Sequence, residues 1–277
     1  EVASSLSLVA ADKAMQFKTP MLSPSSTNPD VTKKGEYVSR ICFIDPFQGE
    51  VMAKFALENL KAKTAVVIRD VKQDYSVGLA DFFTKAFVAK GGKVLSDISF
   101  QSGESDFRAQ LTEVKSKKPD VIFLPGYYGD VALIVKQARG MGLKQPILGG
   151  DGWESEDLLK VAGKAALENT YYSNHYAPDT KDPNAQRFIQ SFREKYNGET
   201  PDAMAALGFD AFNVLMHAMK NAKELTREEI KNALVATKDF PAVTGKITLD
   251  ANRNAVKSAV VLKFVDGKFA YFTTIDP

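Results

Sequence analysis

The sequence predicts an α/β protein with two domains, one of which is a doubly wound parallel sheet. Two observations support this prediction. Between residues 63 and 174, short apolar β-branched runs alternate with amphipathic helical stretches. This alternation is typical of βαβ units and a parallel sheet covered on both faces. The other observation is that 277 residues are enough for two domains.

The opening segment holds too few strands to fold alone. It contains one helical stretch, residues 8–16, and two short strands, residues 21–23 and 38–41. One or two strands cannot make a sheet with its own core. We therefore expect this segment to join helices that come much later in the chain, so that the lobes are discontinuous.

The middle of the chain predicts a regular domain of about five parallel strands. The expected strands are residues 64–68, 94–100, 121–124, 146–148 and 169–173. The helices expected between them are residues 75–90, 107–116, 130–141 and 154–161. In the first of these, apolar residues follow the i, i+3, i+4 spacing of a buried helix face, and Gly91-Gly92 marks its end.

In the last hundred residues the regular alternation of strands and helices ends. Three helical stretches, residues 183–196, 202–222 and 226–236, precede a β-rich tail. The tail has strands at residues 245–249, 258–264 and 269–274, and the Val-Asp-Gly turn between the last two predicts a hairpin. We assign residues 1–45 and 178–250 to lobe I, and residues 46–177 and 251–277 to lobe II.

Composition and motifs argue against several functional classes. Acidic and basic residues are mixed along the chain, with a formal net charge of +2, unlike a nucleic-acid-binding face. Cys42 is the only cysteine, and His175 and His217 do not have the spacing of a metal pair, so we expect no metal and no cofactor. No phosphate-binding loop, nucleophile elbow or acid–base pair is present, which indicates a protein that is not an enzyme.

Polar residues follow the predicted strands where ligands bind. Tyr75, Tyr127 and Asp151 each come after a strand end, and open α/β sheets bind ligands outside these ends. A carboxylate with two aromatic hydroxyls could receive an ammonium group. The hydroxyl-rich segment Ser23–Thr27 suits a carboxylate, so a free amino acid is the simplest ligand. As alternatives, Asp151 could cap a helix, the two tyrosines could pack at the edge of a domain, and the hydroxyl residues could stabilise turns.

Seven motifs, in order and spacing, resemble the branched-chain amino-acid-binding family of periplasmic solute-binding proteins of ABC importers. They are Val2-Ala-Ser-Ser5, Ser23-Pro-Ser-Ser-Thr-Asn-Pro29, Phe43-Ile-Asp-Pro-Phe-Gln-Gly49, Asp74-Tyr-Ser-Val-Gly-Leu79, Phe123-Leu-Pro-Gly-Tyr-Tyr128, Gly149-Gly-Asp-Gly-Trp153 and Val243-Thr-Gly245. The resemblance implies a two-lobe periplasmic-binding-protein type I fold that closes on its ligand. Each lobe is then expected to be a doubly wound parallel sheet, the first of them incomplete in this chain. It also implies further βα units before Glu1, roughly 70–80 residues at about 30 per βαβ unit.

The resemblance assigns the carboxylate end of the ligand to lobe I. Ser4 resembles the residue whose hydroxyl holds the carboxylate, and Thr27 the residue that offers both an N–H and a hydroxyl. The backbone carbonyl of Ser25 is expected to face the ammonium. Ala3 is a possible part of the pocket wall.

The ammonium end is assigned to lobe II. Asp151 is similar to the acidic counter-ion of the ammonium, with Tyr127 beside it and Tyr75 as the aromatic residue of the closing lobe. Trp153 lies next to Asp151 and is a second possible wall residue, although packing explains it equally well.

The expected function is capture of a free aliphatic amino acid (leucine, isoleucine or valine) by hinge closure, and its delivery to the permease of an ABC importer. The expected location is periplasmic or extracellular. A complementing N-terminal segment or a second copy is a further expected partner, and nucleic acid is not. The alternative is the ligand-sensing domain of a receptor or regulator with the same two-lobe fold.

Overall fold

The computed structural model describes residues 1–277 and divides into two units. Unit 1 comprises residues 1–44, 175–259 and 274–277, and unit 2 comprises residues 45–174 and 260–273. Residues 251–259 lie in unit 1, where β10 (Ala255–Val256) pairs with β9 (Gly245–Leu249) in antiparallel fashion.

Unit 2 is built on one seven-stranded sheet with the order β12-β11-β7-β6-β5-β3-β4. Its strands are β3 (Thr64–Asp70), β4 (Lys93–Phe100), β5 (Val121–Phe123), β6 (Ile147–Gly149), β7 (Thr170–Asn174), β11 (Ala259–Val265) and β12 (Lys268–Ile275). The five strands from β3 to β7 are parallel to their neighbours, and β11 pairs antiparallel with β7. The α/β prediction is therefore confirmed, and the five parallel strands are those expected from the sequence.

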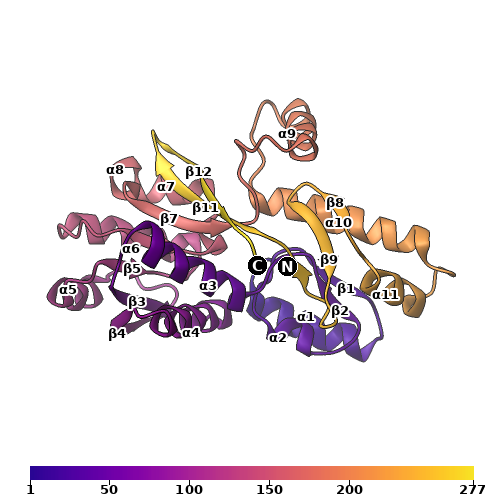
Figure 1. Ribbon diagram of the computed structural model, residues 1–277, viewed down its shortest axis with the longest axis horizontal. Coiled ribbons are helices and arrows are strands. Elements are labelled where there is room, and N and C mark those ends of the chain that lie inside the picture. The colour runs from indigo at the N-terminus through magenta and orange to yellow at the C-terminus, as the bar shows by residue number, and fades with distance from the viewer. The chain divides into compact units, whose positions relative to one another are not determined.

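The order of the strands creates a switch point between β3 and β5. The chain runs from β3 to β4 on one side, then returns to form β5 on the other side of β3. Right-handed crossovers then place the connecting helices on opposite faces. One layer holds α3 (Asp45–Lys54) and α4 (Asp74–Ala89), which pack together (Figure 1). The other holds α5 (Arg108–Lys117), α6 (Tyr128–Gly140), α7 (Glu156–Ala162) and α8 (Lys164–Leu167).

Helix α3 was not expected from the sequence. It carries a glycine in its middle, and buried residues lie on more than one of its sides, so no amphipathic stripe marks it. The packing explains the glycine. A Cβ at Gly49 would lie 2.7 Å from the backbone nitrogen of Phe83 in α4. Gly49 therefore permits the close approach of two helices, and α3 continues into a π-helical segment, η1 (Phe55–Asn59).

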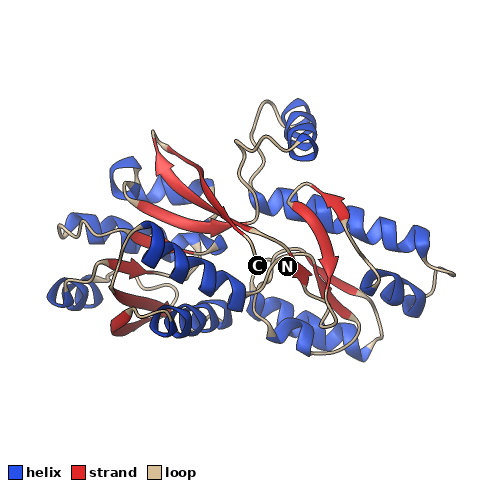
Figure 2. Ribbon diagram, viewed as in Figure 1, coloured by secondary structure: helices blue, strands red, loops and turns tan.

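The predicted hairpin between β11 and β12 is present, and the two strands are neighbours in the sheet (Figure 2). The two connecting residues both have positive φ, 52° at Asp266 and 83° at Gly267. A two-residue Asp-Gly loop with two positive φ values is the type I′ turn that matches the twist of paired strands.

Unit 1 has a small parallel sheet and a separate antiparallel one. The parallel sheet contains only β1 (Met21–Ser23) and β2 (Val38–Arg40), and the antiparallel sheet has the order β10-β9-β8, with β8 at Phe240–Ala242. The helices are α1 (Ser4–Gln16), α2 (Asp30–Lys33), α9 (Pro183–Lys195), α10 (Ala203–Asn221) and α11 (Arg227–Val235). Side-chain caps at Asp182, Asp202 and Thr226 start the last three helices, close to the predicted positions.

Three apolar clusters stabilise unit 1. One joins β2, α10, α11 and the antiparallel sheet around Ile41, Leu207 and Ile247. Another joins α9 to α10 through Phe188, and a third packs α1 against the β1–β2 sheet. None of the helices in the chain is both long and apolar enough to cross a membrane.

Candidate ligand-binding site

The centre of the candidate site in unit 2 is the buried carboxylate of Asp151. It follows β6, in the short 3-10 turn η2 (Asp151–Trp153), and its side chain is only 3% exposed. The Tyr75 hydroxyl donates to Asp151 Oδ1 at 3.0 Å, and the amide of Gln48 donates to the same oxygen at 2.8 Å. A carboxylate taken out of water needs such donors, because burying a charge without them is costly.

Tyr75 is held at this place by the first turn of α4. Its neighbour Ser76 accepts the backbone N–H of Asp70 at 2.9 Å, at the end of β3. The same hydroxyl donates to the carbonyl of Pro125 at 2.5 Å, just past the end of β5. Ser76 therefore links the two strands that flank the switch point, and α4 begins directly above it. Ligands bind at such switch points in open α/β sheets.

The phenol of Tyr75 stays protonated at neutral pH. Burial raises its pKa well above the ordinary value, and the negative charges of Asp151 and Asp45 raise it further. Tyr75 therefore acts as a donor toward Asp151, while its oxygen accepts the N–H of Gly152 at 3.2 Å. Both bonds fix the ring beside the carboxylate.

Tyr127 completes the aromatic side of the site. It is the N-cap residue of α6, follows β5, and is half-buried. Its ring lies 5.2 Å from that of Tyr75, centroid to centroid, at an interplanar angle of 32°. The structure therefore brings together Tyr75, Tyr127 and Asp151, as expected from their positions after neighbouring strands.

Two glycines leave room for this arrangement. A Cβ at Gly150 would lie 2.4 Å from the Tyr75 hydroxyl and 3.0 Å from the Gln48 amide nitrogen. A Cβ at Gly152 would lie 2.7 Å from the carbonyl of Gly126 and 2.9 Å from the Tyr75 ring. The Gly-Gly-Asp-Gly segment thus lets the backbone pass close under the side chains that contact Asp151.

Asp151 does not cap the helix that follows, which was the alternative considered from the sequence. The N-cap of α7 is Ser155, whose hydroxyl accepts the N–H of Asp157 at 3.1 Å. Trp153 is fully buried, and its indole N–H donates to the carbonyl of Leu124 at 3.0 Å. These contacts account for Trp153 as a packing residue, and its place in a pocket wall stays a prediction.

Gln48 was not identified from the sequence as a site residue. It is fully buried on α3 and reaches Asp151 from 103 positions earlier in the chain. The available signal was its place in the Phe-Gln-Gly motif, directly before the glycine that lets α3 approach α4.

In unit 1, the structure gathers the predicted hydroxyl residues at the start of α1 and in the turn after β1. Ser4 is the first residue of α1, after the N-cap Ala3, and its hydroxyl accepts the N–H of Asn28 at 3.3 Å. The Ser7 and Ser26 hydroxyls are 2.7 Å apart, which ties the helix to the turn. The guanidinium of Arg40 donates to the carbonyl of Ser26 at 2.5 Å and so helps to fix the turn.

Ser25 and Thr27 lie in the same turn and are buried. The Ser25 hydroxyl has no hydrogen-bond partner within the chain. Thr27 forms no hydrogen bond there either. These groups, unlike the Ser4 hydroxyl, are not used to hold the turn itself.

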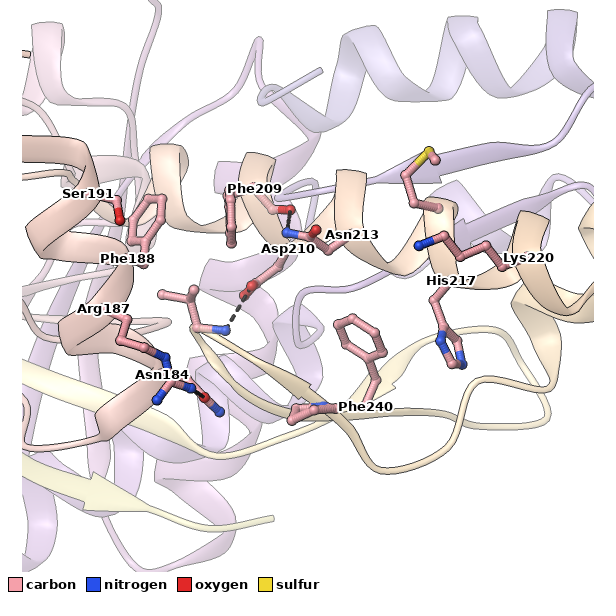
Figure 3. A pocket seen from close by; sticks show the side chains of 13 residues that line it. Asn184, Arg187, Phe188, Ser191, Phe209, Asp210, Asn213, His217, Lys220 and Phe240 are labelled. Atoms are coloured by element: carbon pink, nitrogen blue, oxygen red, sulfur yellow. Dashed lines mark hydrogen bonds between the residues drawn. The ribbon is translucent and has the colours of Figure 1, made fainter. Parts of the chain in front are cut away.

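A cavity of about 550 Å³ in unit 1 lies elsewhere, between α9, α10 and β8 (Figure 3). None of the predicted site residues lines it. Its acidic residue, Asp210, accepts the N–H groups of Val243 and Thr244 at 2.8 and 2.9 Å, one on each carboxylate oxygen. The positive charge of the buried Lys257 also acts on Asp210, so the cavity is poorly suited to an ammonium group. No group of three or more His, Cys, Asp or Glu side chains is arranged to hold a metal ion.

Comparison with known proteins identifies the family. A family model described as periplasmic binding protein matches residues 1–268. The Leu/Ile/Val-binding protein BraC3 of Rhizobium johnstonii is 32% identical over 252 residues, covering 89% of this chain and 66% of that protein. The Leu/Ile/Val-binding protein homolog 3 of Brucella melitensis is 37% identical over 180 residues, covering 63% of this chain and 47% of that protein. The matches thus span less than two thirds of both relatives.

Solved structures agree with these matches. The leucine-binding protein LivK from Thermotoga maritima superposes with a TM-score of 0.96 at 44% identity, covering all of this chain and 79% of that one. The branched-chain amino-acid transporter substrate-binding protein LivJ from Streptococcus pneumoniae, in complex with isoleucine, gives a TM-score of 0.92 at 35% identity, covering 100% and 78%. Periplasmic solute-binding proteins of ABC importers are non-catalytic, so the prediction of a protein that is not an enzyme is confirmed by its family. The chain belongs to the branched-chain amino-acid-binding family of periplasmic binding proteins.

Proposed function

We propose that this protein binds a free aliphatic branched amino acid, with unit 2 holding the ammonium group and unit 1 the carboxylate. The observation that carries the proposal is the buried carboxylate of Asp151 at the switch point of the unit 2 sheet, in a chain similar to Leu/Ile/Val-binding proteins. A charge-assisted hydrogen bond between ammonium and carboxylate is about twice as strong as a neutral one.

The donors around Asp151 support this role. Tyr75 and Gln48 are both neutral, so they stabilise the carboxylate without cancelling its negative charge. Tyr127 adds an aromatic face next to Tyr75, and aromatic faces attract cations. The site therefore combines a fixed anion with aromatic walls, a suitable environment for a small cation.

The hydroxyl residues of unit 1 suit the other end of the ligand. Ser4 lies at the N-terminus of α1, where the helix dipole favours an anion. Ser25 and Thr27 lie beside it in a turn that other residues hold in place. We propose that Ser4 and Thr27 bind the ligand carboxylate, while the Ser25 carbonyl faces the ammonium. Binding by both units requires the lobes to close on the ligand, with Ala3 and Trp153 as candidate walls.

In the cell, we place the protein outside the cytoplasm, in the periplasm or the extracellular space, delivering its ligand to the permease of an ABC importer. This rests on the family and on relatives named as binding proteins of such transporters.

We also propose that additional βα units complete unit 1. Its parallel sheet has two strands, and β1 pairs on one side only. Apolar side chains such as Val9 on α1 and Phe212 on α10 are more than 60% exposed. Native mass spectrometry of the purified protein tests this. A complementing polypeptide segment supports the proposal, whereas a bare mass of 30.3 kDa, or a homodimer alone, contradicts it.

Calorimetry tests the ligand assignment. Leucine, isoleucine and valine should bind, and arginine and glutamate should bind at least tenfold more weakly, because a charged side chain adds a desolvation cost. Asp151→Ala should weaken leucine binding at least tenfold, about 1.4 kcal/mol. The control is Asp157→Ala, at an exposed acidic position of α7. Equal affinity of wild type and Asp151→Ala for leucine would reject the site.

A further inference from the structure

We infer that Gln48 fixes the orientation of the Asp151 carboxylate for ligand binding and accepts a hydrogen bond from the ligand ammonium group. This inference rests on the proposed function of Asp151. Gln48 is fully buried, and its amide nitrogen lies 2.8 Å from Asp151 Oδ1. Since a carboxylate can only accept there, the bonded group is the amide NH₂.

Two donors that converge on one oxygen restrict rotation of the carboxylate. Tyr75 approaches Oδ1 from α4 and Gln48 approaches it from α3. Each donor limits rotation of the carboxyl group about its Cβ–Cγ bond from a different direction. With both, the plane of the group is set by two separate helices. A binding group held in place by packing and by neighbouring hydrogen bonds loses little freedom when its ligand arrives.

The backbone holds Gln48 itself in place. At the next residue, Gly49, even an added Cβ would come within 2.7 Å of the α4 backbone, so α3 and α4 pack closely beside Gln48. On the opposite side, an added Cβ on Gly150 would lie 3.0 Å from the Gln48 amide nitrogen. The amide is thus confined between α3 and the segment after β6, a confinement that a flexible surface glutamine does not have.

The oxygen of the Gln48 amide indicates that Gln48 also contacts the ligand directly. Gln48 Oε1 is buried and has no hydrogen-bond partner within the chain. A buried acceptor without a partner carries a desolvation penalty, so it asks for an explanation. An α-ammonium group has three N–H donors, more than one carboxylate oxygen can use. The amide would therefore donate to Asp151 with its nitrogen and accept from the same ammonium group with its oxygen.

The test is a double-mutant cycle on leucine affinity. Gln48→Met keeps the side-chain volume and removes both polar atoms, and should weaken leucine binding at least tenfold. In an Asp151→Asn background the same change should weaken binding less than threefold. The charge that Gln48 orients is then gone, and with it the group that holds the ammonium against the amide oxygen of Gln48. Gln48→Asn, which keeps the amide but shortens the arm, should resemble Gln48→Met. The matched control is Gln137→Met, at a glutamine of α6 whose amide is hydrogen-bonded at both ends, and it should leave affinity unchanged.

A purely structural role for Gln48 would lower affinity by the same factor in both backgrounds, and this result overturns the inference. So does unchanged affinity of Gln48→Met. A second arm needs no ligand and separates the inference from the proposed function. The urea midpoint shift caused by Gln48→Met should shrink by at least half in the Asp151→Asn background. If wild type binds no branched amino acid, the proposed function fails, and the urea arm alone decides whether Gln48 and Asp151 are coupled.

Discussion

The Tyr75 hydroxyl lies 3.0 Å from the Asp151 carboxylate, although 76 positions separate the two residues in the chain. The strand order brings them together, because β3 and β6 both flank β5 in the parallel part of the sheet. Tyr75 lies in the first turn of α4, the helix after β3, and Asp151 follows β6. Their hydrogen bond therefore depends on the fold, and it links the α3–α4 layer to the end of the central strands.

Removal of the Tyr75 hydroxyl tests this link. Tyr75→Phe keeps the ring against Tyr127 but removes the donor to Asp151 and the acceptor for the Gly152 N–H. A hydrogen bond to a charged group contributes about 1.5–3 kcal/mol, so leucine binding should weaken by about tenfold or more in calorimetry. Tyr128→Phe, at an exposed neighbour of the site, is the control. Equal affinities of the two variants would show that the Tyr75 hydroxyl does not support the binding group.

A methyl group at Gly150 should disturb both donors of Asp151 at once. Its Cβ would lie 2.4 Å from the Tyr75 hydroxyl, which would have to move. It would also lie 3.0 Å from the Gln48 amide nitrogen, a contact tighter than an ordinary van der Waals one. We expect Gly150→Ala to lower the urea midpoint and to weaken leucine binding at least tenfold.

The control for this change is Gly140→Ala. A Cβ at Gly140, at the end of α6, meets no atom within 4 Å, and alanine favours helix. Gly140→Ala should therefore leave affinity unchanged and stability unchanged or slightly higher. A Gly150→Ala variant that behaves like Gly140→Ala would contradict the close packing around Asp151.

The sequence was sufficient to predict the unit 2 sheet, because the strands and helices of this unit are short, regular and sharply bounded. The positions of Tyr75, Tyr127 and Asp151 after strands also predicted that these residues meet, since strand ends of a parallel sheet share one edge. Helix α3 and Gln48 could not be found in the same way. Gly49 weakens the helical signal of α3, and its reason, contact with α4, lies in tertiary packing that no local pattern records.

The hydroxyl residues of unit 1 show a second limit of prediction from sequence. Residue type alone does not distinguish the hydroxyls of Ser4, Ser25 and Thr27, but the structure gives them different local hydrogen bonds. The Ser4 hydroxyl accepts the Asn28 N–H, whereas the Ser25 hydroxyl has no partner within the chain. Such differences depend on which backbone groups the turn leaves nearby, and residue type alone does not reveal them. The meeting of the unit 1 and unit 2 residues around one ligand stays a prediction.

Thr27→Val should separate ligand binding from stability. Thr27 makes no hydrogen bond within the chain, so replacing its hydroxyl by a methyl group should change the free energy of unfolding by less than about 0.5 kcal/mol. Leucine affinity should fall at least tenfold, because the ligand carboxylate loses a donor.

The matched control for Thr27 is Thr32→Val in the same unit. The Thr32 hydroxyl donates to the Asn254 amide oxygen at 2.9 Å and accepts from Arg40 at 3.3 Å. Its loss leaves buried polar groups without a partner, so Thr32→Val should destabilise by about 1–3 kcal/mol. Should Thr27→Val destabilise as much as Thr32→Val and bind leucine normally, Thr27 would be a structural residue.

Lys257, a buried lysine of unit 1, predicts an unusual dependence of stability on pH. Lys257 is 6% exposed and donates to the Thr244 hydroxyl at 2.5 Å. Burial lowers the pKa of Lys257 to about 8, while the charge of Asp210 opposes the shift. In the unfolded chain a lysine titrates near pH 10.4. Between about pH 8 and pH 10.4 the unfolded state therefore binds a proton that the folded state lacks, and stability must rise with pH across this window.

The size of this rise follows from the pKa difference. At about 1.4 kcal/mol per pKa unit, wild type should gain up to about 3 kcal/mol over Lys257→Met between pH 7.5 and pH 10.5. Urea unfolding of both proteins across this range measures the difference between their free energies of unfolding. Contributions from groups that titrate equally in the two proteins cancel in this difference. The exposed Lys220→Met variant controls for loss of a lysine without loss of a buried charge. A difference between wild type and Lys257→Met that stays level or falls as the pH rises would mean that Lys257 enters the folded state fully charged, with Asp210 as its effective counter-ion.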